Sequence, residues 1–143
     1  MKRRWKFVGA VVSLLAVAAC LLSALHAAKS RAQSINCHNR MVSICMAARL
    51  WAGDHDGILP PDFLTISNEL CSPVILHCRG DISRTRATNW AEYSTANCSY
   101  EMVSPSGKDG DKDLVLMRCK VHGHIGYADG SVFDGVRRQW KIF

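Results

Sequence analysis

Two hydrophobic patterns follow one another in the first part of the chain. From Phe7 to Ala28 no charged residue interrupts a run made mostly of Val, Leu, Ala, Gly, Ser and Cys. A helix rises about 1.5 Å per residue, so a helix of this length crosses a hydrocarbon core of roughly 30 Å. The pattern predicts a transmembrane helix over residues 7–28.

The second pattern is amphipathic. Residues 27–51 contain no Pro or Gly and are rich in good helix formers. Apolar residues recur there at spacings of three and four: Cys37, Met41, Ile44, Ala48 and Trp51. This stripe predicts that the helix continues over residues 29–52, with one face buried by a small domain, and ends near Gly53. Two helices with a break near Lys29 are the alternative, although the sequence has no helix breaker there.

Short elements separated by turns follow. The sequence predicts a short helix over Thr65–Leu70, a helical turn over Asn89–Thr95, and strands over Val74–Leu76, Tyr100–Val103 and Leu114–Cys119. The clearest hairpin pairs Ile125–Ala128 with Ser131–Phe133 around Asp129-Gly130, a pair favoured in type I′ turns. We therefore expect an α+β protein, with a long N-terminal helix packed on a small antiparallel sheet.

Charge distinguishes the two sides of the apolar run. Lys2, Arg3, Arg4 and Lys6 precede it, and only Lys29 and Arg31 follow it closely. By the positive-inside rule, residues 1–6 form a cytoplasmic leader and residues 29–143 form an exported head. Beyond Arg31 the chain holds twelve Lys and Arg residues against twelve Asp and Glu residues. The head is therefore neutral and lacks the basic surface that nucleic-acid binding requires.

Seven cysteines are many for 143 residues. Cys20 lies in the apolar run, and the others lie in the exported head, where an even number favours disulfides. Cys37 and Cys45 would lie roughly 12 Å apart on one helix, so they cannot pair with each other. A disulfide between Cys78 and Cys119 would tie two distant segments together, and Cys71 with Cys98 is a weaker pairing.

A metal site is the alternative to that disulfide. Cys119, His122 and His124, with Cys78 and His77 elsewhere in the chain, are ligand types that suit Zn²⁺. Their Cys-x2-His-x-His spacing is not that of a standard zinc knuckle, and one short segment does not readily supply three tetrahedral ligands. The disulfide is therefore the simpler expectation.

An acidic triplet, Asp109, Asp111 and Asp113, resembles the start of a Ca²⁺ loop. An EF-hand would need Gly and a bidentate Glu where this chain has Leu114 and Lys120. A solvated acidic loop is the favoured interpretation, with a Ca²⁺ site of another kind as the alternative. The chain has no G-x-S-x-G, H-E-x-x-H or phosphate-binding loop, so we expect neither catalysis nor a resident cofactor.

Several segments resemble those of a known family. They lie in the helix, in the middle of the chain and near its end: Leu21–Leu25, Ala28–Cys37, Ala47–Ala52, Ser67–Leu70, Arg118-Cys119, His122-Gly123 and Ala128–Val132. From Leu21 to Val132 the chain resembles type II secretion pseudopilin-like proteins with a prepilin-type N-terminal domain, of the kind found in Verrucomicrobia and Planctomycetes. The most specific part of the resemblance is the C-terminal motif, with His122, Gly123, Asp129 and Gly130.

The N-terminus departs from that family's pattern. Members usually carry a basic leader, a Gly and then Phe-Thr-Leu-Ile-Glu, which is the signal for prepilin peptidase. Here Gly9 is followed by Ala10, Val11 and Val12 with no glutamate, so the cleavage motif is degenerate. A lipobox-like run ending at Cys20 offers lipidation as an alternative, although Leu21 continues the apolar segment.

The resemblance implies a non-enzymatic, membrane-anchored pseudopilin-like subunit associated with type II secretion or type IV pilus-like machinery. It implies a bacterial inner membrane location, with the N-terminus cytoplasmic and the head periplasmic. The implied partners are the lipid bilayer and other pilin-like or secretion-system subunits. The alternative function is a periplasmic binding module, anchored by lipid or by the helix, that uses its Cys and His residues.

Overall fold

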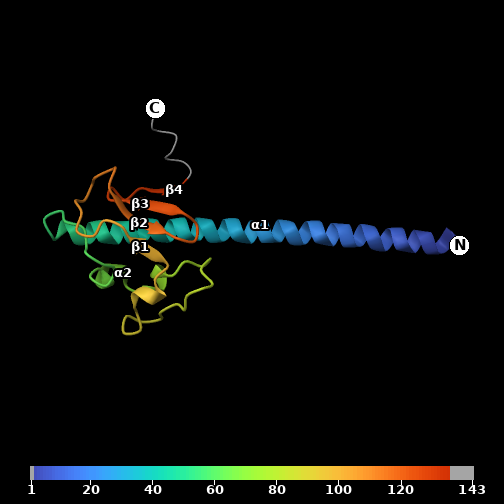
Figure 1. Cartoon of the computed structure of the whole chain (residues 1–143), viewed down its shortest axis with the longest axis horizontal. Coiled ribbons are helices and arrows are strands. Elements are labelled where there is room, and N and C mark those ends of the chain that lie inside the picture. Colours follow the sequence, from blue (N-terminus) through green and yellow to red (C-terminus); the bar gives the residue numbers. More distant parts are fainter. Residues whose placement is uncertain (1, 136–143) are drawn as a thin grey trace, which may run out of the picture. The chain divides into compact units, whose positions relative to one another are not determined.

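A computed structural model describes residues 2–135, with side chains from residue 13 onward (Figure 1). Helix α1 runs without interruption from Lys2 to Gly53, so the predicted helix is confirmed and the alternative break near Lys29 is absent. The chain divides into two compact units, Met1–Gln33 and Ser34–Phe143, with α1 contributing to both. The backbone of residues 2–12, including the predicted processing site at Gly9, belongs to α1, and the side chains of this segment lie outside the described part of the chain.

The first unit exposes its apolar side chains. Large hydrophobic residues on this part of α1 are between 56% and 71% exposed: Leu14, Leu15, Val17, Leu21, Leu22 and Leu25. Cys20 is exposed as well. Exposing so many consecutive apolar residues to water costs about 25 cal/mol of free energy per Å² of apolar surface. By its length and composition this helix can cross a membrane.

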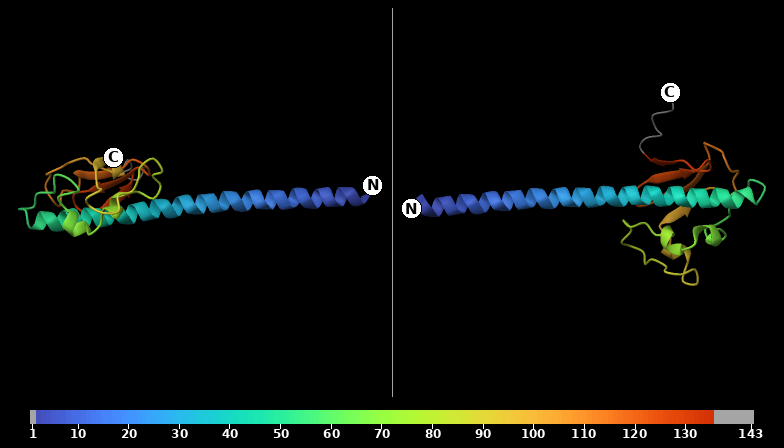
Figure 2. Two further views of the ribbon diagram at one scale, coloured as in Figure 1. Left: turned by 90° about the horizontal axis from the view of Figure 1, so that it is seen from below. Right: turned by 180° about the vertical axis from the view of Figure 1, so that it is seen from behind.

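The second unit buries the amphipathic stripe of α1. Cys37, Met41, Ile44 and Ala48 are at most 1% exposed, and Trp51 packs partly buried against the same core. Figure 2 shows the strands lying over one side of this C-terminal half of the helix. The predicted amphipathic segment is thus confirmed, and it forms the spine of the head.

Helical turns and irregular chain, residues 54–99, connect α1 to the sheet. They contain α2 (Ser67–Leu70) and two 3₁₀ turns, η1 (Pro73–Leu76) and η2 (Thr95–Asn97). The predicted helical turn over Asn89–Thr95 is present as a turn at residues 90–92, just before η2.

The predicted strand over Val74–Leu76 is wrong, because these residues form η1. Pro73 opens that turn with a fixed φ, and the Ser72 hydroxyl accepts a hydrogen bond from the Val74 N–H. The Arg40 guanidinium of α1 then donates to the carbonyls of Val74 and His77. The Ser72 cap and the Arg40 side chain of α1 therefore stabilise a 3₁₀ turn, although the β-branched composition of this segment favours a strand.

Four strands form an antiparallel sheet in chain order: β1 (Tyr100–Met102), β2 (Val115–Cys119), β3 (His124–Tyr127) and β4 (Val132–Asp134). Tyr100 pairs with Cys119 across β1 and β2, and Ile125 pairs with Phe133 across β3 and β4. A long helix packed on a small antiparallel sheet is the predicted α+β fold, which the structure confirms.

The turn of the β3–β4 hairpin differs from the predicted type I′. Gly130 has a φ of +87°, but Asp129 does not have the positive φ that a type I′ turn requires. The Gly130 N–H donates to the Tyr127 carbonyl at 3.0 Å, and the Tyr127 N–H donates to the Ser131 carbonyl at 2.8 Å. The loop is therefore a turn followed by a glycine bulge, in which only the glycine needs the left-handed conformation.

Gly126 lets α1 approach the sheet closely. A Cβ atom at this position would lie 2.7 Å from the Cys45 Sγ and 3.1 Å from a side-chain carbon of Met117. We expect Gly126→Ala to lower the free energy of unfolding of the head by about 1–3 kcal/mol, through overpacking. Thermal unfolding of the detergent-solubilised protein measures this effect. Gly53→Ala is the control, since nothing lies within 4 Å of its Cβ; an equal loss in both variants would contradict the packing argument.

Candidate metal centre

Three cysteines and a histidine converge inside the head. Cys37 comes from α1, Cys78 follows η1, Cys119 ends β2, and His122 lies in the turn between β2 and β3. One ligand atom from each, three sulfurs and one imidazole nitrogen, lies within 4.8 Å of all the others. The three cysteines are at most 1% exposed, and His122 is half-buried. We call these four residues the Cys3His cluster.

The fold positions each sulfur through contacts with its own element. Cys37 is the first residue of the buried stripe of α1, and the Tyr100 hydroxyl donates to its Sγ at 3.7 Å. The β1–β2 register sets Cys119 opposite Tyr100. Cys78 is held by its backbone N–H, which donates to the Ser99 hydroxyl at 3.0 Å. One tyrosine and the residue before it therefore connect all three cysteines.

The turn after β2 brings His122 to the sulfurs. The Gly123 N–H donates to the Cys119 carbonyl at 3.0 Å, and Gly123 has a φ of +72° that favours glycine. The His122 Nδ1 then lies 3.2 Å from the Cys78 Sγ. Gly80 makes room for the ring, because a Cβ there would lie 2.8 Å from the His122 Cε1.

The cluster favours one thiolate in particular. Hydrogen bonds from the thiols of Cys37 and Cys78 lower the pKa of Cys119, and the N–H groups of His122 and Val121 lower it further. The hydrogen bonds that the Cys37 thiol gives to Cys119 and Cys78 raise the pKa of Cys37, and burial raises it further. The site is thus arranged to hold negative charge on sulfur, as a metal-binding thiolate requires.

Tetrahedral coordination fits this set of atoms. Zn²⁺ binds thiolate sulfur at about 2.3 Å and imidazole nitrogen at about 2.0–2.1 Å, so the ligand atoms of such a set lie roughly 3.5–3.8 Å apart. Three sulfurs and one nitrogen are a ligand set that structural zinc sites use. The Cys3His cluster therefore has the composition and the spacing to hold one ion.

The predicted disulfides are not formed in the structure, in which all seven cysteines are free. Cys78 and Cys119 do lie together, as the predicted pairing requires, but they share the cluster with Cys37 and His122. The weaker pair is also unbonded. Cys71 is exposed, and the buried Cys98 donates from its Sγ to the Tyr100 carbonyl at 3.2 Å.

His124, the third residue of the predicted zinc set, belongs to a different group, with His38 and Asp134. Its Nε2 lies 3.1 Å from both the hydroxyl and the carbonyl oxygen of Ser34. Its Nδ1 lies 2.6 Å from the Asp134 Oδ1, a close contact without hydrogen-bond geometry. Protein atoms thus surround both ring nitrogens, and His124 anchors β3 to α1.

The acidic triplet has local roles in the loop before β2. Asp109 forms an ion pair with Arg49 of α1 at 2.8 Å. Asp111 accepts a hydrogen bond from the Asp113 N–H at 2.9 Å. These contacts order the loop and attach it to the helix.

The remaining motif residues near the end of the chain shape the β3–β4 hairpin. The Asp129 carboxylate accepts hydrogen bonds from the Ser131 N–H and hydroxyl, and its carbonyl accepts one from Arg49 at 3.0 Å. A Cβ at Gly130 would lie 3.3 Å from the Arg49 side chain. Arg49 therefore links α1 to the hairpin and to the loop that carries Asp109.

The sequence does not identify Cys37 as a site residue, because its position in the apolar stripe of the helix already accounts for its burial. The helical pattern places it correctly on the buried face but does not reveal what it faces across the core. The usable signal is the Cys119-x2-His122 spacing, which brings two ligands together on one turn. Cys37 and Cys78 join them only through the packing of the head.

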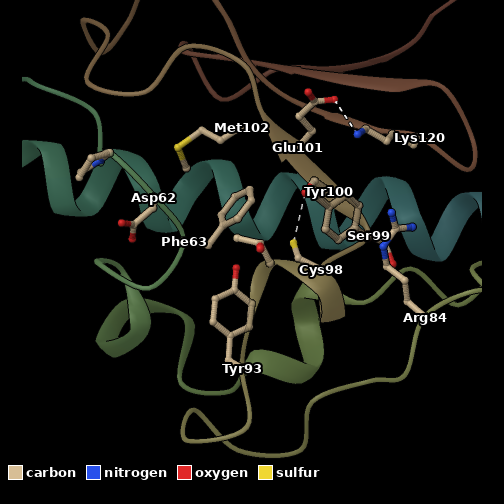
Figure 3. Close-up of a pocket in the computed structure, with 12 residues that line it drawn as sticks. Asp62, Phe63, Arg84, Tyr93, Cys98, Ser99, Tyr100, Glu101, Met102 and Lys120 are labelled. Atoms are coloured by element: carbon tan, nitrogen blue, oxygen red, sulfur yellow. Dashed lines mark hydrogen bonds and ion pairs between the residues drawn. The ribbon is translucent and has the colours of Figure 1, made fainter.

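A pocket of about 330 Å³ lies between β1 and the loops before it (Figure 3). Phe63, Tyr93 and Tyr100 give it an aromatic lining. Its Glu101 and Lys120 side chains form an ion pair at 3.3 Å.

Asp81 is a buried carboxylate beside the cluster segment. Burial alone would raise its pKa, but hydrogen bonds from Ser83, Ser99 and Arg84 together hold the pKa of Asp81 well below its usual range. Such a carboxylate stabilises the fold above the unfolded pKa of about 3.9, and this stabilisation is lost as the pH falls towards the folded pKa.

We therefore expect Asp81→Asn to lower the free energy of unfolding by roughly 2–3 kcal/mol at neutral pH. The variant should also lose less stability than the wild type when the pH falls from 5 to about 2. Denaturant unfolding across this pH range measures both effects. Asp54→Asn, at an exposed position, is the matched control; a similar loss there would refute the role of the buried carboxylate.

Comparison of the chain with family models, with curated proteins and with solved structures found no match.

Proposed function

We propose that the protein is a non-enzymatic, membrane-anchored, pilin-like subunit that works through contacts with lipid and with other subunits of a secretion or pilus-like assembly. One observation carries this proposal: a single helix is apolar and exposed over residues 13–28, whereas from Cys37 onward it is amphipathic, with one face buried in the head. The first part suits lipid or the apolar helices of neighbouring subunits. The second part is the spine of a folded head.

The charges flanking the helix support one orientation. Four basic residues precede the apolar run, and the chain beyond Arg31 carries no net charge. The positive-inside rule then keeps the N-terminus in the cytoplasm and exports the head to the periplasm. A neutral head is compatible with protein partners, and it gives no support to nucleic-acid binding.

Photo-crosslinking in native membranes tests the subunit role. A photoreactive residue in place of Leu25, on the exposed helix, is expected to crosslink to a second copy or to another pilin-like secretion subunit. The matched position is Leu50 on the head part of α1, since the two side chains are equally exposed, at 66%. Crosslinks from Leu25 to lipid alone, with no protein product from either position, would contradict the proposed role.

The second candidate is an anchored binding module, favoured by the Cys3His cluster. The cluster is buried, however, and its cysteines pack in the centre of the head core. Burial hinders the exchange of a ligand with solvent. The cluster therefore supports the structure of the head better than it supports a transport or storage role.

A further inference from the structure

We infer that Cys37, Cys78, Cys119 and His122 bind one Zn²⁺ ion, as a structural centre that joins α1, the segment after η1 and the sheet. The inference is independent of the proposed function, because it concerns how the head holds together. Three segments far apart in the sequence deliver four ligand atoms to one point, with none further than 4.8 Å from another.

A disulfide explains these positions less well. A bond between Cys78 and Cys119 would use two sulfurs and leave Cys37 as a fully buried thiol beside it. It would also give no reason for the His122 Nδ1 to lie 3.2 Å from the Cys78 Sγ. A tetrahedral ion uses all four atoms.

The backbone around the cluster adds a second feature of the site. The Gly123 N–H donates to the Cys119 carbonyl at 3.0 Å, within the turn that carries His122. The absence of a side chain at Gly80 also leaves the space that the His122 ring fills.

Four protein ligands make this a closed site. Catalytic zinc sites keep one position open for water, whereas structural sites fill all four with side chains. On binding, those thiols that carry protons release them to solvent, and the ion stays divalent. The centre therefore ties segments of the head together and performs no reaction.

The direct test is the zinc content of the full-length protein, purified in detergent under reducing conditions and measured by plasma mass spectrometry. We expect about one zinc per chain, and none in Cys37→Ser, Cys78→Ser, Cys119→Ser or His122→Ala. Each of these variants should bind added zinc roughly 100-fold or more weakly than the wild type. His122→Cys should keep the ion, because a fourth thiolate replaces the imidazole. Cys98→Ser is the matched control, as a buried cysteine outside the cluster.

A second readout does not depend on how well the variants fold. Co²⁺ added to the metal-free wild-type protein should give the visible absorption bands of tetrahedral cobalt together with thiolate charge-transfer bands. Failure of the reduced wild-type protein to bind Zn²⁺ or Co²⁺ would overturn the inference. So would a Cys78–Cys119 disulfide mapped in protein extracted directly from membranes.

Discussion

Removal of zinc from the purified protein by a chelator is expected to lower the melting temperature of the head by roughly 15–30 °C. A ligand present at about 1,000 times its Kd stabilises the folded state by about 4 kcal/mol, and each kcal/mol shifts the melting temperature of a domain of this size by about 4–8 °C. Cys119→Ser should have the lowered melting temperature even without chelator, and adding the chelator should change its melting temperature little. Scanning calorimetry or circular dichroism in detergent measures both effects.

The control for this experiment is Cys98→Ser. Cys98 is 6% exposed and donates from its Sγ to the Tyr100 carbonyl. A serine hydroxyl can keep that hydrogen bond, so we expect Cys98→Ser to lower the free energy of unfolding by no more than about 1 kcal/mol. A melting temperature that the chelator leaves unchanged, or an equal loss in the Cys98 and Cys119 variants, would contradict a structural zinc centre.

Acidic residues in the apolar half of α1 are expected to prevent membrane integration. An Asp near the middle of a spanning helix costs about 2.5–3.5 kcal/mol. The double variant Leu15→Asp/Val17→Asp should therefore move most of the protein from the membrane to the alkali-extractable fraction. Fractionation of cells that express each variant, followed by immunoblotting, measures the distribution.

The control places the same charges on the head part of the same helix. Ile35 and Leu50 are 63% and 66% exposed, against 64% for Leu15 and 56% for Val17. If the whole helix lay in water, the two double variants would behave alike. We expect Ile35→Asp/Leu50→Asp to remain in the membrane, and loss of integration in both variants would argue against a lipid-facing first half.

The sequence predicts those features of the fold that depend on regular patterns. The uncharged run and the spacing of Met41, Ile44 and Ala48 define both halves of α1, because a helix buries residues three and four apart on one face. The sheet follows from strand composition and from Gly130, which marks the hairpin. The strand predicted over Val74–Leu76 is wrong, because Pro73 and Arg40 impose a 3₁₀ turn on residues whose composition favours a strand.

The candidate site was only half predictable. Cys119 and His122 lie on one turn, so their association can be read from spacing alone. Cys37 and Cys78 reach them through the register of α1 against the sheet and through the Ser99 contact, which are tertiary features. For His124 the spacing is misleading. It is only two residues from His122, but its ring nitrogens lie in a different group, with His38 and Asp134.

Two exposed cysteines provide the most direct test of the anchor. Cys20 lies on the apolar half of α1 and Cys71 on the head, and both are exposed in the structure, whereas the other five cysteines are buried. In right-side-out spheroplasts, a membrane-impermeant maleimide should modify Cys71 and leave Cys20 unmodified until the protein is denatured, because lipid covers Cys20 alone. Intact mass of the same sample measures whether Cys20 carries an acyl chain, and we expect none. Equal modification of both cysteines, or modification of Cys71 only in inside-out vesicles, would contradict a lipid-embedded helix that carries an exported head.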